Sequence, residues 1–405
     1  MKTKTTYPNA MPQGVWVLGF VSMLMDISSE MVHCLLPMFM TTVLGASALT
    51  IGLIEGFAES TALIVKIFSG ALSDYLGKRK SLALVGYALG ASTKPIFAIA
   101  SSVGLVFSAR LVDRIGKGIR GAPRDALVAD MTPPQIRGAA FGLRQALDTV
   151  GAFVGPLLAV GLMWLWADNF RAVFWVAVIP GVMAVLLLWL GIREPATPVE
   201  ERKINPITRA NLKKLSASYW WVVCVGALFT LARFSEAFLV LRAQQIGMAI
   251  TWIPLIMVAM NMIYAATAYP FGKLSDQMSP FKILIASLFV LMTADLLIAS
   301  SRDVTVLFMG VALWGIHMGM SQGLLAKLVA DTAPPMLLGT AYGIFNLVCG
   351  VFMLIASGVA GLVWDLLGAE FTFYYGTLFC LLTLVAICFQ FHANEKSHEN
   401  YTKAS

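Results

Sequence analysis

Carboxylates and bases gather in the first half of the chain, inside runs of residues that are otherwise apolar. Asp26 and Glu30 lie four residues apart, so in a helix both side chains point to one side. Two like charges on one face oppose each other's ionisation, so one of these carboxylates could take up and release a proton. Glu59, in the next apolar run, is the third candidate for proton coupling.

A polar stripe follows one face of the run 102–131. Asp113, Lys117, Arg120 and Arg124 are spaced by four, three and four residues, as on one side of a helix. At a rise of ~1.5 Å per residue, the middle of this run and of the first run reach the same depth. The bases favour an anionic ligand. We expect six residues to line a substrate cavity: Arg114, Lys117, Arg120, Arg233, Glu236 and His317.

Other charges fit a structural role. Arg144 and Asp148 are four residues apart and predict an ion pair that holds helices in register. Lys94 and Asp295 fall near the ends of their apolar runs, where long or polar side chains can reach an interface.

The elements that position these groups are membrane helices. The chain of 405 residues is 58% hydrophobic and 13% charged, whereas soluble proteins carry about 25% charged residues; its mean hydropathy is +0.78. Apolar runs of about 20 residues, enough to cross a bilayer, recur from end to end. They predict twelve spans: 14–42, 49–73, 80–100, 102–131, 139–165, 171–192, 218–241, 250–275, 281–300, 304–331, 339–364 and 371–391.

The same composition argues against several other partners. No basic patch alternates with aromatic residues in a polar segment, so we expect no nucleic-acid partner. The five cysteines lie in apolar runs without metal-ligand spacing, so we expect neither a resident metal nor a cofactor.

The connections between spans carry an orientation signal. Basic residues concentrate in the loops after even-numbered spans and in the tail: Lys78, Arg79, Lys80, Arg137, Arg193, Arg202, Lys203, Arg209, Lys213, Lys214, Lys282 and Lys396. The opposite side has only Arg171, Arg242 and Arg302. This asymmetry predicts that both termini are cytoplasmic.

Three short motifs repeat at nearly one offset. Residues 70–76 return as 272–278, Ala129-Asp130 returns 201 residues later, and Ser29-Glu30 returns as Ser235-Glu236. Ordered repeats at one offset predict two homologous halves. We divide the chain into a six-helix bundle at 1–192, a cytoplasmic linker at 193–217, a second six-helix bundle at 218–392, and an unstructured cytoplasmic tail at 393–405.

Residues 70–80, GALSDYLGKRK, resemble the loop between helices 2 and 3 of the major facilitator superfamily, written G-x-L-a-D-r-x-G-r-k. Tyr75 departs from the pattern, which usually has a base there. The resemblance implies an all-α membrane protein with twelve transmembrane helices in two homologous six-helix bundles, and a central cavity lined by helices 1, 4, 7 and 10. It also implies a cytoplasmic gate formed by Gly70, Asp74, Gly77, Arg79, Asp130 and, in the second half, Asp276.

Two further strings extend the resemblance. Gly151, Gly155 and Pro156 resemble the helix-5 signature associated with antiporters, although Ala159-Val160 stands where a pair of small residues is expected. Residues 120–125, RGAPRD, resemble a string from an uncharacterised prokaryotic branch of the superfamily.

These patterns predict a secondary active transporter, not an enzyme, that moves a small molecule across the cytoplasmic (inner) membrane of a prokaryote by alternating access. We expect a proton-coupled monomer that exports an amphipathic or anionic compound, with protons and the lipid bilayer as its other partners. An importer of an organic acid, siderophore or metal chelate is the alternative, and methionine-rich helices make copper a weaker one. An intramembrane enzyme lacks a recognisable catalytic arrangement, and a sensor would need a signalling domain.

Overall fold

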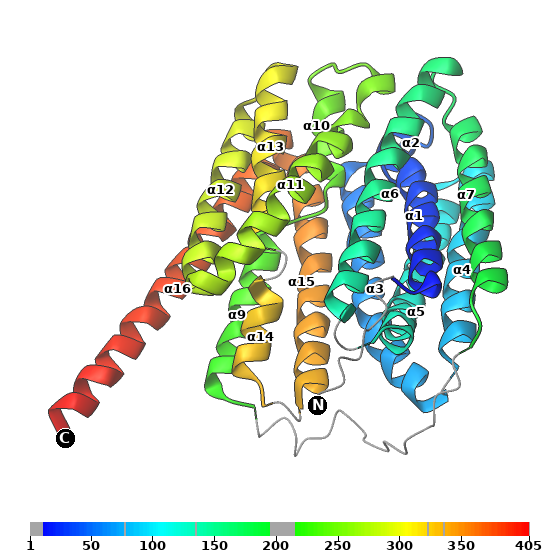
Figure 1. The fold of residues 1–405 in the computed structure, drawn as a ribbon. Coiled ribbons are helices and arrows are strands. Elements are labelled where there is room, and N and C mark those ends of the chain that lie inside the picture. The colour runs from blue at the N-terminus through cyan, green and yellow to red at the C-terminus, as the bar shows by residue number, and fades with distance from the viewer. Residues whose placement is uncertain are drawn as a thin grey trace, which may run out of the picture.

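The computed structural model describes residues 11–76, 78–133, 136–194, 215–321, 324–334 and 337–404. Within these ranges the chain folds into helices without strands. Figure 1 shows two helical bundles side by side, the first from α1 to α7 and the second from α9 to α16. The expected all-α membrane fold with two bundles is confirmed.

The first bundle contains α1 (Gln13–His33), α2 (Leu36–Thr42), α3 (Ala48–Leu76), α4 (Arg79–Ile99), α5 (Val103–Met131), α6 (Arg137–Leu165) and α7 (Phe170–Gly191). The second contains α9 (Ala217–Ala232), α10 (Ala237–Gln245), η2 (Ile250–Trp252), α11 (Leu255–Gln277), α12 (Pro280–Ser300), α13 (Val304–Ser321), α14 (Leu324–Thr332), α15 (Leu338–Leu367) and α16 (Ala369–Ala404).

Each predicted span corresponds to one helix or to consecutive helices. Eleven spans in the described residues are long and apolar enough to cross a membrane. The exception is α5, which has 29 residues but carries the polar stripe. The predicted linker is described only at its two ends, so the domain boundaries stay predictions. The predicted unstructured tail is wrong for its backbone, because α16 continues as a helix to Ala404.

Two predicted spans are interrupted near their middle or outer part. The first span breaks between His33 and Leu36, and Pro37, the second residue of α2, cannot donate a backbone hydrogen bond to the preceding turn. The seventh span breaks at residues 233–236, and Arg233 leaves the helical region with φ −115° and ψ 84°. Corresponding helices of the two halves are therefore both discontinuous, which frees backbone and side chains to face the space between the halves.

The two halves meet most extensively along α3 and α15. A Cβ added to Gly52 would lie 2.1 Å from the carbonyl oxygen of Ser357, and one added to Gly361 would lie 2.5 Å from that of Ala48. Glycines therefore let the two backbones approach closely, as in other membrane helix pairs. A second contact joins α6 to α11.

Hydrogen bonds also join the halves on what we call the distal face, which carries the α2–α3, α6–α7, α10–α11 and α15–α16 connections. The Asp365 carboxylate accepts hydrogen bonds from the backbone amides of Ala48 (3.1 Å) and Leu49 (2.9 Å). The Thr251 hydroxyl donates to Asp168 across 2.7 Å. The distal face is therefore closed in this structure.

Candidate functional site

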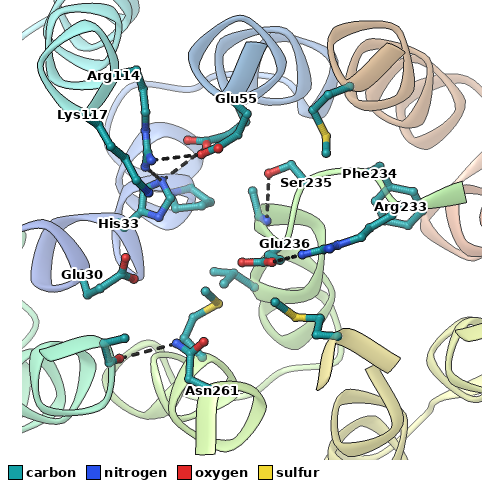
Figure 2. A pocket seen from close by; sticks show the side chains of 18 residues that line it. Glu30, His33, Glu55, Arg114, Lys117, Arg233, Phe234, Ser235, Glu236 and Asn261 are labelled. Carbon is teal, nitrogen blue, oxygen red and sulfur yellow. Dashed lines mark hydrogen bonds and ion pairs between the residues drawn. The ribbon is translucent and has the colours of Figure 1, made fainter. Parts of the chain in front are cut away.

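A cavity of about 310 Å³ lies between the two halves, and Figure 2 shows its lining side chains. It combines a charged wall from the first half with a mixed wall from the second. The lining residues are Glu30, His33, Pro37, Glu55, Glu59, Arg114, Lys117, Ala152, Arg233, Phe234, Ser235, Glu236, Ala237, Val240, Met257, Asn261, Met318 and Met353.

The wall of the first half is an ion-pair network between α3 and α5. Arg110 donates two hydrogen bonds to Glu55, Nε to Oε1 at 3.1 Å and Nη2 to Oε2 at 2.6 Å. Arg114 Nη1 lies 3.1 Å from Glu59 Oε1. Bidentate and charge-assisted pairs of this kind fix side-chain orientation in addition to compensating charge.

His33, the last residue of α1, completes this network. Arg114 Nη2 lies 2.8 Å from His33 Nε2. Because a guanidinium group can only donate hydrogen bonds, His33 Nε2 must be the acceptor and the ring carries its proton on Nδ1. His33 Nε2 is also 3.4 Å from Glu55 Oε2, a contact between two acceptors in this state.

The wall of the second half is built at the break between α9 and α10. Arg233 Nη2 and Glu236 Oε1 lie 3.4 Å apart. Around this pair the lining combines two polar residues, Ser235 and Asn261, with apolar ones that include one phenylalanine, one valine and three methionines. Methionine thioethers adapt to ligands of different shape, so this wall suits the apolar part of an amphipathic molecule.

Two charged groups of the cavity have no partner. Glu30 and Lys117 both line the space (Figure 2), and neither makes a hydrogen bond or an ion pair with any described residue. The other lining acids and bases are held by a neighbour within their own half. Glu30 and Lys117 are therefore the charges most available to a bound molecule or a proton.

The glycines of the predicted helix-5 motif pack α6 directly behind the acids of α1. A Cβ on Gly151 would lie 2.9 Å from the Asp26 Cβ, and one on Gly155 would lie 2.8 Å from the Glu30 Cβ. Pro156 follows within the same helix. The two glycines therefore allow α6 to pack closely against the side of α1 that carries Glu30. Asp26 lies one turn away from Glu30 and outside the cavity lining.

Two expected cavity residues lie elsewhere. Arg120 is buried between α4 and α5 with its guanidinium carbon 4.9 Å from the centre of the Tyr87 ring. It faces α4, which packs closely against α5 at this point because Gly86 has no side chain. A Cβ added to Gly86 would lie only 2.7 Å from the backbone nitrogen of Arg120. His317 is turned towards α12, with its Nδ1 2.8 Å from the Ser287 carbonyl oxygen.

Lys94 and Asp295 correct another expectation, because neither reaches an interface. Lys94 is 1% exposed, and its Nζ lies 2.8 Å from Asp113 Oδ1 and 3.2 Å from Ser29 Oγ. Asp295 is fully buried at 0% exposure. Helix packing around α4 and α12 covers both side chains, and the apolar run alone does not reveal this.

The predicted cytoplasmic gate is described only in part. Arg79 forms an ion pair with Asp130, and its Nη1 also donates to the Ala126 carbonyl oxygen at 3.4 Å. Gly70 lies in α3 where a Cβ would be in ordinary contact with Ala122. Gly77 and the side chains of Asp74 and Asp276 lie outside the described residues.

A second group of charges lies on α5 and α6, away from the cavity lining. The predicted pair of Arg144 with Asp148 is present at 2.5 Å, and Arg124 Nη2 lies 3.1 Å from Asp125 Oδ1. Arg124 also donates to Ser22 Oγ at 3.1 Å, which ties α5 to α1.

Sequence reasoning missed His33, Glu55 and Arg110 as members of the site. Glu55 and Glu59 are four residues apart, so their shared helix face was readable from the sequence. His33, Glu55 and Glu59 also bring ligand atoms within 4.8 Å of one another. Because Arg110 and Arg114 already compensate both carboxylates, this cluster is an ion-pair network and a poor match for a cation.

Comparisons with known proteins agree with this geometry. A family model described as Major Facilitator Superfamily matches residues 18–357 and 236–404. The chain is 32% identical over 388 residues to an uncharacterised MFS-type transporter of Methanocaldococcus jannaschii, covering 93% of this chain and 94% of the relative. It is 28% identical over 183 residues to the multidrug resistance protein MdtH of Photorhabdus laumondii subsp. laumondii, covering 45% and 44%. A crystal structure of a POT family transporter with a thioalcohol-conjugated peptide matches with a TM-score of 0.78 at 15% identity, covering 94% and 96%.

Proposed function

Because the chain belongs to the Major Facilitator Superfamily and is a multi-pass membrane transporter, we propose that it exports an amphipathic, anionic compound in exchange for protons. The cavity is the observation that carries this proposal. It offers the unpaired Lys117, one arginine from each half, and a methionine-rich wall. An anionic head and an apolar body would find complementary surfaces there.

The charge arrangement supports proton coupling through Glu30. In this state the Glu30 side chain faces the cavity and has no hydrogen-bond or ion-pair partner among the described residues. In the opposite state a base such as Lys117 could approach it and hold it ionised. A proton biases two states only through its different affinity for them, and a hundredfold difference in affinity shifts the balance about a hundredfold. Asp26 and Glu59 are the next candidates.

Export and orientation rest on weaker support. Partial matches to MdtH proteins are named for multidrug resistance, and the helix-5 motif is associated with antiporters. The loop charges favour cytoplasmic termini in a prokaryotic inner membrane. We propose a monomer, because each half contributes one wall to a cavity within a single chain.

Inverted inner-membrane vesicles test the proposal. With an acidic lumen, they should accumulate taurocholate, an amphipathic anion, and should not accumulate the amphipathic cation tetraphenylphosphonium. Collapse of the pH gradient with nigericin should abolish the accumulation.

The coupling residue is tested in the same vesicles. Glu30→Gln should retain taurocholate exchange but lose gradient-driven accumulation, because the neutral amide cannot carry a proton. Accumulation only in right-side-out vesicles would favour the importer of an organic acid, siderophore or metal chelate. If both Glu30→Gln and Asp26→Asn still accumulate, these acids are not the coupling groups.

A further inference from the structure

Asp295, on α12 of the second bundle, is a buried carboxyl group that the proposed mechanism does not use. It is 0% exposed, and neither of its carboxyl oxygens has a hydrogen-bond partner among the described residues. An ionised carboxylate without a partner inside a membrane helix is costly. Such groups normally serve a function, or carry a proton that removes the charge.

The carboxyl group lies close behind the cavity wall. A Cβ placed on Gly376 of α16 would be 2.5 Å from Asp295 Oδ2 and 3.1 Å from Cε1 of Phe234. The Asp295 carboxyl and the Phe234 ring therefore meet at the same point on α16. Phe234 also lines the cavity, as Figure 2 shows. One aromatic ring thus stands between the carboxyl group and the cavity.

That ring belongs to a non-helical segment between two helices. Phe234 lies in the break between α9 and α10, where the backbone is not helical. It is held by aromatic contacts, with ring centres 5.6 Å from Trp314 and 5.6 Å from Phe373. Arg233 precedes it in the break, and its guanidinium group lies 3.4 Å from the Glu236 carboxylate within the described part of the chain. A change in the backbone conformation of residues 233–236 would displace the Phe234 ring and the Arg233 guanidinium group together.

The internal repeat shows what the second half lacks. Lys94 stands 201 residues before Asp295, and Asp113 stands 201 residues before Trp314. In the first half this pair of positions forms a 2.8 Å ion pair. In the second half the indole Nε1 of Trp314 is itself buried without a partner. Asp295 therefore has no counter-charge of the kind that the equivalent site provides.

We propose that Asp295 is a proton-binding site of the second half, which opens to the cavity when the break at 233–236 moves Phe234 aside. The inference rests on the proposed proton coupling and adds, beside Glu30, a second group whose proton affinity differs between the two states. In the distal-closed state the carboxyl is sealed and holds its proton. In the distal-open state cavity water reaches it, the proton leaves through the cavity, and Arg233 compensates the carboxylate.

Other titratable groups near Asp295 do not supply a partner in the described structure. Those on α13, α14 and α16, which pack against α12, include His317, Lys327, Asp331, Glu370, Tyr374, Tyr375, Cys380 and Cys388, and Arg233, Glu236 and Arg242 lie in α10 or in the break before it. His317 is bonded to Ser287, and Arg242 to Ile298, Ala299, Ser301, Gln245 and Glu370. The proton on Asp295 therefore responds mainly to whether water enters.

The experiment measures the balance of the two states without any substrate. Spin labels on Val43→Cys and Ala249→Cys place one probe on the distal face of each half, and the exposed Cys224 and Cys388 are replaced by serine. Electron–electron resonance then gives the ratio of distal-open to distal-closed protein in lipid nanodiscs. Because the closed state holds the proton, this ratio should rise with pH, by up to tenfold per pH unit for each coupled proton.

Asp295→Asn should make the ratio of distal-open to distal-closed protein less dependent on pH, by the contribution of one proton, because the isosteric amide stays neutral in both states. Phe234→Ala should remove the same contribution with Asp295 in place, since water would reach the carboxyl in both states. Glu30→Gln should leave the contribution of Asp295 to this pH dependence unchanged. Equal melting temperatures of the wild type and Asp295→Asn at acidic pH would establish that the variant is folded.

The outcomes separate the two proposals. If Asp295→Asn and Phe234→Ala keep the full slope while Glu30→Gln loses it, Asp295 is only a neutral structural acid and the proposed function stands. If the wild type shows no pH dependence, both fail. If only Asp295→Asn and Phe234→Ala flatten the slope, the second half alone carries the coupled proton.

Discussion

Removing the Asp365 carboxylate should open the distal face. In the closed state this group accepts hydrogen bonds from the first two amides of α3, at 3.1 and 2.9 Å, and so caps a helix of the other half. A helix N-cap is worth about 0.5–2 kcal/mol, and the negative charge at a helix N-terminus adds a few tenths. Because Asp365 is exposed, we expect Asp365→Ala to cost about 1–2 kcal/mol, which corresponds to roughly a 5–30-fold change in an equilibrium.

The assay is the distance distribution between spin labels at Val43→Cys and Ala249→Cys. The distal-open population should increase by that factor relative to the closed one, because the variant loses an acceptor that the second half offers to α3 only when the halves are in contact. Asp365→Asn keeps one acceptor oxygen and should have a smaller effect.

Asp303 offers a matched control for this prediction. Its carboxylate caps α13 by accepting from the Val306 amide at 3.0 Å, within the second half alone. Asp303→Ala should therefore leave the distance distribution unchanged. A distribution that is the same in Asp365→Ala and the wild type would refute the view that this cap holds the distal face closed.

Two further predictions follow from the cavity. Arg114→Gln and Arg233→Gln should each weaken taurocholate binding by about tenfold, because each variant loses one charge-assisted contact. His317→Gln should not weaken it, because His317 lies outside the cavity lining. Equilibrium binding to the purified protein checks this, and unchanged affinity in both arginine variants would reject it. Gly155→Ala should lower stability by about 1–3 kcal/mol, because its Cβ would approach that of Glu30 to 2.8 Å. Gly161→Ala on the same helix meets no atom within 4 Å and is the control in thermal unfolding; equal melting temperatures would contradict the packing argument.

The helices could be predicted from the sequence because bilayer thickness sets a length and a hydropathy that each span must meet. The discontinuity at residues 233–236 could not, because the predicted span 218–241 is long enough for one helix and no proline or glycine marks the break. Lys117, from the stripe on α5, and its neighbour Arg114 both line the pocket between the halves, and their role in binding stays a prediction. Helical spacing alone could not predict that Arg120 faces α4, because this orientation depends on the close packing of α4 against α5 at Gly86.

The burial of charged side chains was harder to predict than their positions along the helices. Lys94 and Asp295 were expected at an interface because their positions along the helix are near its end. Burial depends on what neighbouring helices cover, and a single sequence gives no measure of that. His33 and Glu55 were missed for a related reason, since their importance comes from Arg110 and Arg114, which meet them only in the folded protein.

The location of the ion pairs has an electrical consequence. Every ion pair found among the described residues joins groups of the same half. When the halves rock, each paired acid therefore travels with its base, and these pairs carry little net charge across the membrane field. One elementary charge moved through 100 mV is worth about 2.3 kcal/mol, so this pairing shields the conformational change of the empty protein from the membrane voltage. Voltage sensitivity should then enter through the cargo and the protons, and the balance of their charges would decide whether a cycle is electrogenic.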